Sequence, residues 1–224
     1  MKSIVISIGG SVILTDDIDD SYFKKLNLIL KNLIKKYKIY IIVGGGKTSR
    51  AYINFGRKLG FKEKTLDQFG IDITRINAKL LTYIIENSNT KIPETTSDAK
   101  KIKKPIVIMG GTTPGHSTDM VGAELAEKTK ATKYIIVTNV DGVYDKDPNK
   151  YPDAKQIKEI KIDDLIEMFG TSWDQAGKNI VIDGPALKII KKAKIPTLVL
   201  NGEKLIQLES AINNLIFNGT VIKV

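Results

Sequence analysis

The sequence predicts an α/β fold, a three-layer αβα sandwich around a mostly parallel sheet. Short apolar runs rich in isoleucine and valine alternate with amphipathic stretches of helical period almost throughout the 224 residues. The runs are apolar at successive positions, as in strands that are covered on both faces. Glycine clusters follow several of these runs and indicate sharp exits at the strand ends.

The elements of the first half follow from this alternation. Three apolar runs predict strands, over residues 3–8, 39–43 and 105–111. Four stretches predict helices, over residues 19–37, 48–59, 65–87 and 119–131. In the first of these, Phe23, Leu26 and Leu30 recur at helical spacing, with an Asp or Ser as the N-cap, and Gly60 ends the second.

The second half continues the pattern to the last residue. Strands are predicted over 133–144 and 196–200, and 219–224 is expected as an edge strand. Helices are predicted over 163–169, 184–194 and 204–217. The turn-rich segment 144–156 marks a soft boundary inside one domain, between an N-terminal half of about residues 1–132 and a C-terminal half of about residues 133–224.

The composition is that of an ordinary globular protein, with 42% hydrophobic and 27% charged residues. The absence of cysteine excludes disulfides and thiolate metal sites, and it is compatible with the cytoplasmic location that we expect. The N-terminus does not resemble a signal peptide, and no run approaches the roughly 18 apolar residues that span a membrane. The net charge of +10 comes from lysines scattered over polar helix faces, which favours solvated surfaces over nucleic-acid binding.

Four predicted strands end in chemically unusual loops: Gly9-Gly10-Ser11, Gly44-Gly45-Gly46-Lys47, residues 110–115 and residues 138–142. In open α/β sheets, ligands bind beyond the carboxyl ends of the strands. Glycine lets backbone N–H groups approach a phosphate closely. Tight turns alone would explain one glycine pair, but clusters after three strands favour a phosphate site. Neither G-x-x-x-x-G-K-[ST] nor G-x-G-x-x-G occurs, so this site would be built from separate strand exits.

The segments SIGGS, VGGGKTSR, MGGTTPGHSTD and TNVDGVYDKDP follow one another in this order, and with VIDGPALKII they span nearly the whole chain. In sequence and spacing they resemble the amino acid kinase superfamily, and within it the archaeal-type uridylate (UMP) kinases. The resemblance implies reversible phosphoryl transfer from ATP to UMP, giving ADP and UDP in pyrimidine nucleotide biosynthesis. It also implies an amino acid kinase-like fold and a homohexamer.

The same resemblance implies a role for each motif. The implied UMP-binding residues are Gly44, Gly45, Asp67, Thr112, Thr113, Pro114, Gly115, His116, Ser117 and Thr118. The implied ATP-binding residues are Gly9, Gly10, Ser11, Gly46, Arg50, Thr138, Asn139, Tyr144 and Asp147. Asp67 would form a hydrogen bond with the UMP ribose. The alternative is that Asp67 is only a carboxylate at the start of a helix, without a ligand. The implied cofactor is Mg²⁺, held through the ATP phosphates and water rather than by protein ligands.

This reaction needs few catalytic side chains. Because the acceptor is already a phosphate oxygen, it needs no general base, and catalysis consists of positioning and charge stabilisation. Arg50 and Lys47 are the candidate catalytic cations, although Lys47 may equally be a solvated residue in the first turn of a helix. We interpret His116, the one histidine of the chain, as a loop residue near the nucleotide rather than a proton-transfer group.

One position departs from the superfamily pattern. Many members carry a lysine two residues before the first glycine pair, where it contacts the transferring phosphoryl group, and this chain has Ser7 there. We therefore place Ser7 in the catalytic set as the position to explain. The missing cation would come from Lys47, Arg50 or Lys188, and a solvated helix lysine is the structural alternative for Lys188.

Other functions stay open at this point. Another small-molecule kinase of the same fold is one alternative, but an isopentenyl phosphate kinase would be expected to carry a histidine in the second glycine cluster, where this chain has Gly44-Gly45-Gly46. A nucleotide-binding sensor without turnover is another, and Ser7 motivates it. Apolar residues on more than one face of the helix predicted over 65–87 fit either core burial or a subunit interface.

Overall fold

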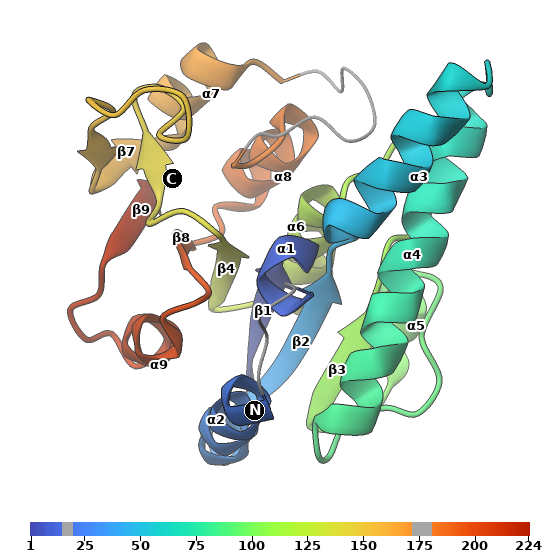
Figure 1. Ribbon diagram of the computed structural model, residues 1–224. Coiled ribbons are helices and arrows are strands. Elements are labelled where there is room, and N and C mark those ends of the chain that lie inside the picture. The colour runs from blue at the N-terminus through green and yellow to red at the C-terminus, as the bar shows by residue number, and fades with distance from the viewer. Residues whose placement is uncertain (15–19, 172–180) are drawn as a thin grey trace.

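A seven-stranded sheet runs through the computed structural model, which describes residues 1–14, 20–171 and 181–224 (Figure 1). Its strand order is β3-β2-β1-β4-β8-β9-β7. Its strands are β1 (Lys2–Ile8), β2 (Tyr37–Val43), β3 (Ile106–Met109), β4 (Lys133–Thr138), β7 (Glu159–Lys161), β8 (Thr197–Asn201) and β9 (Gly219–Lys223). Paired strands run parallel except for β8 and β9, so the predicted mostly parallel sheet is confirmed.

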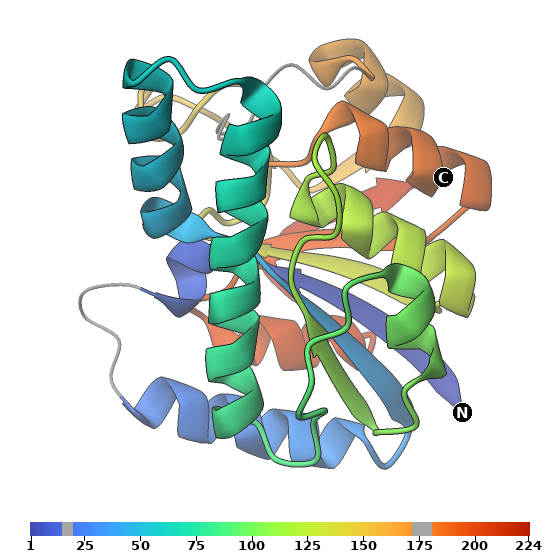
Figure 2. The same cartoon turned by 90° about the vertical axis from the view of Figure 1, so that its right-hand side faces the viewer.

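Helices cover both faces of this sheet, which makes the three layers visible in Figure 2. The helices of the first half are α1 (Gly10–Ile13), α2 (Asp20–Leu33), α3 (Gly46–Lys58), α4 (Glu63–Ile84), α5 (Thr96–Lys101) and α6 (Thr118–Thr129). Those of the second half are α7 (Ile162–Phe169), α8 (Gly184–Ala193) and α9 (Leu205–Ile212). None of the described helices is both long and apolar enough to cross a membrane.

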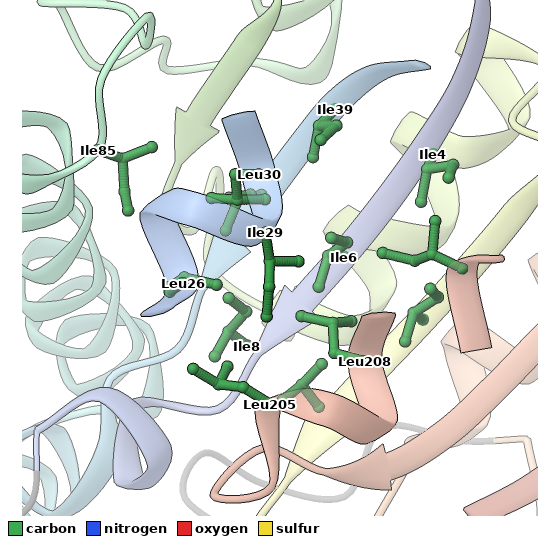
Figure 3. Packing of buried hydrophobic residues seen from close by; sticks show 14 of the residues in the cluster. Ile4, Ile6, Ile8, Leu26, Ile29, Leu30, Ile39, Ile85, Leu205 and Leu208 are labelled. Carbon is green, nitrogen blue, oxygen red and sulfur yellow. The ribbon is translucent and has the colours of Figure 1, made fainter. Parts of the chain in front are cut away.

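Two hydrophobic cores form because side chains of a strand alternate between the faces of a sheet. One core joins the sheet to α2, α9 and the C-terminal part of α4, and Ile4, Ile6 and Ile8 of β1 point into it. Figure 3 labels residues of this core: Ile4, Ile6 and Ile8 of β1, Ile39 of β2, Leu26, Ile29 and Leu30 of α2, Ile85 directly after α4, and Leu205 and Leu208 of α9. The other core contains Val5 of β1 and side chains of α5, α6, α7 and α8.

Several predicted elements run past their observed ends: the helix predicted over 19–37 stops at Leu33, the helix over 65–87 stops at Ile84, and two further elements overrun more. The strand predicted over 133–144 stops at Thr138, and residues after a turn form β5 (Val143–Tyr144), which pairs antiparallel with β6 (Gln156–Ile157). The helix predicted over 204–217 stops at Ile212. Its end is set by Asn214, which has a left-handed φ of 59°, and by a 2.9 Å bond from Leu215 N to the Ser210 carbonyl, the Schellman pattern.

The last strand is not an edge strand as predicted. β9 pairs with β8 on one side and with β7 on the other, so β7 forms that edge of the sheet. The short elements α1, α5, β6 and β7 were not predicted, because two to six residues carry too little periodicity to indicate an element. Asp19, the expected start of the first helix, lies outside the described residues.

Candidate functional site

The carboxyl ends of the parallel strands lie at one edge of the sheet, and the predicted loops leave from there. In spatial order, the loops follow β3 (residues 110–117), β2 (44–45), β1 (9) and β4 (139–142). β1 therefore lies between the loop after β3, assigned to UMP, and the loop after β4, assigned to ATP, while the exits of β1 and β2 carry the glycines assigned to the phosphates of both nucleotides. In an open α/β sheet, the ligand-binding crevice lies where the strand order reverses its direction. Here the order runs from β1 to β2 and β3 on one side and from β1 to β4 on the other.

The exits of β1 and β2 pack backbone against backbone. A Cβ atom at Gly10 would lie 2.3 Å from the Gly46 nitrogen, and one at Gly44 would lie 2.7 Å from the Gly10 nitrogen. Gly46 also has a φ of 64°, which favours glycine. The glycine triplet after β2 thus has a structural cause, because only bare backbone lets the two loops approach so closely. Gly9 N donates to the Val137 carbonyl at 2.9 Å and ties this exit to β4.

Two cations stand beside these glycines. Lys47 and Arg50 lie in the first turns of α3, and their spacing of three residues puts them on neighbouring sides of the helix. Lys47 is exposed and Arg50 is half-buried. The N-terminus of α3 adds its own positive potential at the same place. Lys188, in contrast, lies exposed on α8, as expected of a solvated helix lysine.

Ser7 lies next to the first glycine pair and is bonded to a half-buried carboxylate. Its hydroxyl donates to Oδ1 of Asp119 at 2.8 Å. Asp119 is in the first turn of α6, and Asp183, the N-cap of α8, is its electrostatic neighbour. Burial and the charge of Asp183 raise the pKa of Asp119 to about 7. Burial likewise raises the pKa of Asp183. The two carboxyl groups therefore tend to share one proton.

The sequence prediction missed this carboxyl pair, and it also missed three residues of α4 that hold the neighbouring loops. Thr74 Oγ1 accepts from Gly111 N at 2.7 Å. Arg75 donates to the carbonyls of Gly111 and Thr112, both at 3.2 Å. Asn77 is buried and donates to the Gly44 carbonyl at 2.8 Å. Polar residues inside an apolar helical stripe were the signal that could have revealed Thr74 and Asn77.

The loop assigned to UMP is held at Gly115 and at Ser117. Asp67 of α4 accepts from Gly115 N at 2.7 Å through Oδ2, and burial raises the pKa of this carboxyl group. Ser117 caps α6 by accepting from Met120 N at 2.9 Å, and its hydroxyl also bonds to Asp183. The imidazole of His116 is half-buried, with Nδ1 3.5 Å from Glu124 Oε1. Asp67 therefore positions the loop, whatever it does for a ligand.

The predicted ATP-binding residues beyond β4 come together around one cleft of about 150 Å³. The lining includes the four predicted residues Thr138, Asn139, Tyr144 and Asp147. Sequence reasoning missed the rest of it, which comprises Val140, Asp145, Lys146, Pro148, Asn149, Phe169 and Val181. A cleft with apolar walls and a few polar groups is typical of a small-molecule site.

Comparison with known proteins identifies the family. The model of the amino acid kinase family matches residues 2–201. The chain belongs to the amino acid kinase family. Within the family, it is 43% identical over 213 residues to the uridylate kinase of Methanobrevibacter smithii, covering 94% of each chain. It is 40% identical over 227 residues to the uridylate kinase of Methanocaldococcus jannaschii, covering 98% of this chain and 99% of that one.

Solved structures of the family agree with the fold described here. The crystal structure of uridylate kinase from Archaeoglobus fulgidus matches with a TM-score of 0.84 and 36% identity, over 99% of this chain and 100% of that chain. The UMP kinase of Ureaplasma parvum, at 24% identity and a TM-score of 0.78, shows the same fold. The predicted α/β fold and the resemblance of the motifs to this family are both confirmed.

Proposed function

We propose that this chain is a uridylate kinase, which transfers the terminal phosphoryl group of ATP to UMP and forms ADP and UDP reversibly. The observation that carries the proposal is the placement of two nucleotide loops on opposite sides of β1. The loop 112–118 lies beyond β3, and the cleft around Thr138, Asn139 and Tyr144 lies beyond β4. The identities of 43% and 40% to uridylate kinases over nearly the full chain support the choice of UMP.

In this proposal the N-terminal half, about residues 1–132, binds UMP, and the C-terminal half, about residues 133–224, binds ATP. The two sets of phosphates meet above the exits of β1 and β2, where the close packing of Gly10 on Gly46 leaves no side chain in the way. Substrates held so that attacking and leaving oxygens are in line can react without a covalent intermediate. The protein contributes orientation and positive charge.

Positive charge at the transfer point comes from α3 rather than from β1. Arg50, Lys47 and the helix N-terminus stand beside the glycine loops. Ser7 supports the site from below through its bond to Asp119 and brings no charge of its own. Mg²⁺ would neutralise the phosphates of ATP when bound. In this proposal the ion is held by the ATP phosphates and water rather than by protein ligands.

We further propose that copies of this chain associate through α3 and α4. Four apolar side chains of α3 and the following turn are exposed: Tyr52, Phe55, Leu59 and Phe61. Three more follow one another along α4: Ile76, Leu80 and Tyr83. An apolar face of this extent marks an interaction surface in a soluble protein. We propose that a second copy of this chain covers the face, in line with the oligomer that the sequence resemblance implies. Tyr83→Glu would place a charge in this contact, so it should lower the mass measured by light scattering.

An ADP-release assay tests the function directly. Mg-ATP is offered with UMP, CMP, AMP, GMP and isopentenyl phosphate as separate acceptors. We expect turnover with UMP at an ordinary enzymatic rate of roughly 1–1,000 per second. Turnover with isopentenyl phosphate alone would assign the chain to a different kinase of this fold. Binding of ATP and UMP with no turnover of any acceptor would instead indicate a nucleotide sensor.

A further inference from the structure

The loop that follows β4 is attached to the turn between β8 and α9 through one carboxylate. Oδ1 of Asp141 accepts from Asn201 Nδ2 at 3.0 Å and from Lys204 Nζ at 3.2 Å. Lys204 Nζ also lies 3.4 Å from Oδ2. Asn201 is the buried last residue of β8, and Lys204 is the N-cap of α9. The carboxylate therefore joins two neighbouring strand exits at the edge of the sheet where the site lies.

Asp141 stands between two groups of residues that line the donor cleft. Asn139 and Val140 precede it in the lining, and Tyr144 follows. The side chain of Asp141 bonds to the turn after β8 instead, so it holds the cleft wall from behind. Gly202 N adds a bond of 2.8 Å to the Thr138 carbonyl from the same turn.

Side chains of the C-terminal half hold the rest of this loop. Val143 N donates to Thr220 Oγ1 at 2.8 Å, and Gln156 Nε2 donates to the Asp141 carbonyl. A Cβ atom at Gly142 would lie 2.5 Å from Thr220 Oγ1. The loop thus has little freedom where Thr220 packs on it, and its side next to the cleft depends on Asp141 and its partners.

The charge of Asp141 persists at neutral pH. Burial raises the pKa of its carboxyl group, but the hydrogen bonds from Asn201 and Lys204, with a further one from Asn218, outweigh burial and lower the pKa below its ordinary value. The side chain of Asp141 is 27% exposed and that of Lys204 is 52% exposed. Such an ion pair adds little to global stability, so its effect should be local to the loop.

We propose that Asp141, Asn201 and Lys204 form a brace that positions the donor-cleft wall and so sets the affinity for ATP. The inference rests on the proposed function, because it takes the cleft as the ATP site. A wall held in place before binding spares the nucleotide the cost of ordering it. Loss of the brace should therefore weaken ATP binding while the distant UMP loop stays unaffected.

The test compares Asp141→Ala with the wild type in steady-state kinetics and in calorimetric titration with a non-hydrolysable ATP analogue. We expect KM for ATP and Kd for the analogue to rise by about five- to tenfold, with KM for UMP and kcat within about twofold. As a single substitution, Lys204→Arg keeps the charge and should leave KM for ATP nearly normal. Lys204→Met removes the charge and should raise KM for ATP. Combining Asp141→Ala with Lys204→Met should cost no more than Asp141→Ala alone, because both remove one brace.

Glu159→Ala is the matched control, since it removes an exposed ion pair with Lys223 (2.5 Å) in the same half of the chain and should leave both KM values unchanged. Equal rises in KM for ATP and UMP, or none, would overturn the inference. So would a larger effect of Lys204→Met than of Asp141→Ala, which would mean direct contact of Lys204 with ATP. Absence of UMP turnover in the wild type would refute the proposed function, whereas analogue binding would still test the brace.

Discussion

Ser7 Oγ and Asp119 Oδ1 are joined by a hydrogen bond of 2.8 Å, which ties the end of β1 to the first turn of α6. The bond is made at the position where the resemblance of the sequence leads us to expect a lysine. In this chain it links the glycine exit of β1 to the end of the loop assigned to UMP. It also places Asp119 beside a second carboxyl group, that of Asp183, and this has a measurable consequence for stability.

Asp119→Asn should stabilise the fold, and should do so more at pH 8 than at pH 5. The pKa of Asp119 is raised from 3.8 to about 7, so the folded protein keeps a proton that the unfolded chain releases. The free energy of unfolding therefore falls as the pH rises between these two values. Asparagine removes that charge and can still accept from Ser7. Tm should rise by several degrees at pH 8, as thermal scans at both pH values would measure.

The control for this variant is Asp98→Asn. Asp98 is exposed on α5, and the bonds from Thr95 and Lys101 lower its pKa, so its titration is complete below pH 5. Its effect on Tm should be the same at pH 5 and pH 8. A Tm difference of Asp119→Asn that is likewise independent of pH would show that Asp119 and Asp183 do not share a proton.

Gly10→Ala should destabilise the protein by about 1–3 kcal/mol, because the new methyl group would meet the backbone of Gly46 at 2.3 Å. Gly70→Ala in α4 is the control, since its methyl group would meet no atom closer than 3.4 Å and alanine favours a helix by up to about 1 kcal/mol. Urea unfolding of both variants measures the difference. Equal stabilities would mean that the exits of β1 and β2 are not packed together in solution.

Arg50→Ala should lower kcat/KM for phosphoryl transfer by more than about tenfold, if Arg50 stabilises the transferring charge. Lys58→Ala removes an exposed cation from the far end of the same helix and should leave kcat/KM unchanged. Steady-state kinetics with both nucleotides varied gives the comparison. Normal kinetics of Arg50→Ala would remove this residue from the catalytic set.

Asp67→Ala should raise KM for UMP more than KM for ATP. Asp67 holds Gly115 N at 2.7 Å, so its loss frees the loop 112–118 even before any contact with the ribose is considered. Asp72→Ala removes an exposed carboxylate one turn further along α4 and serves as the control. The two KM values, measured separately, decide the matter, and an equal rise in both would contradict the assignment of this loop to UMP.

The sequence predicted the sheet because its strands are continuous apolar runs, and it predicted the site edge because glycines follow those runs. It could not show that Gly10 rests on Gly46, since contacts between separate loops depend on strand order. Asp119 and Asp183 were missed for a similar reason: 64 positions separate them, and nothing in either segment indicates that the other is its neighbour. β9 was placed at an edge because β7 is too short to be predicted.

The central claim is that UMP and ATP bind at the same time on opposite sides of β1. Titration calorimetry of UMP into the protein, with and without a saturating non-hydrolysable ATP analogue, tests it most directly. We predict that UMP binds with one site per chain in both titrations, so that a ternary complex forms. Loss of UMP binding in the presence of the analogue would mean that the two nucleotides compete for one site, and would contradict the account.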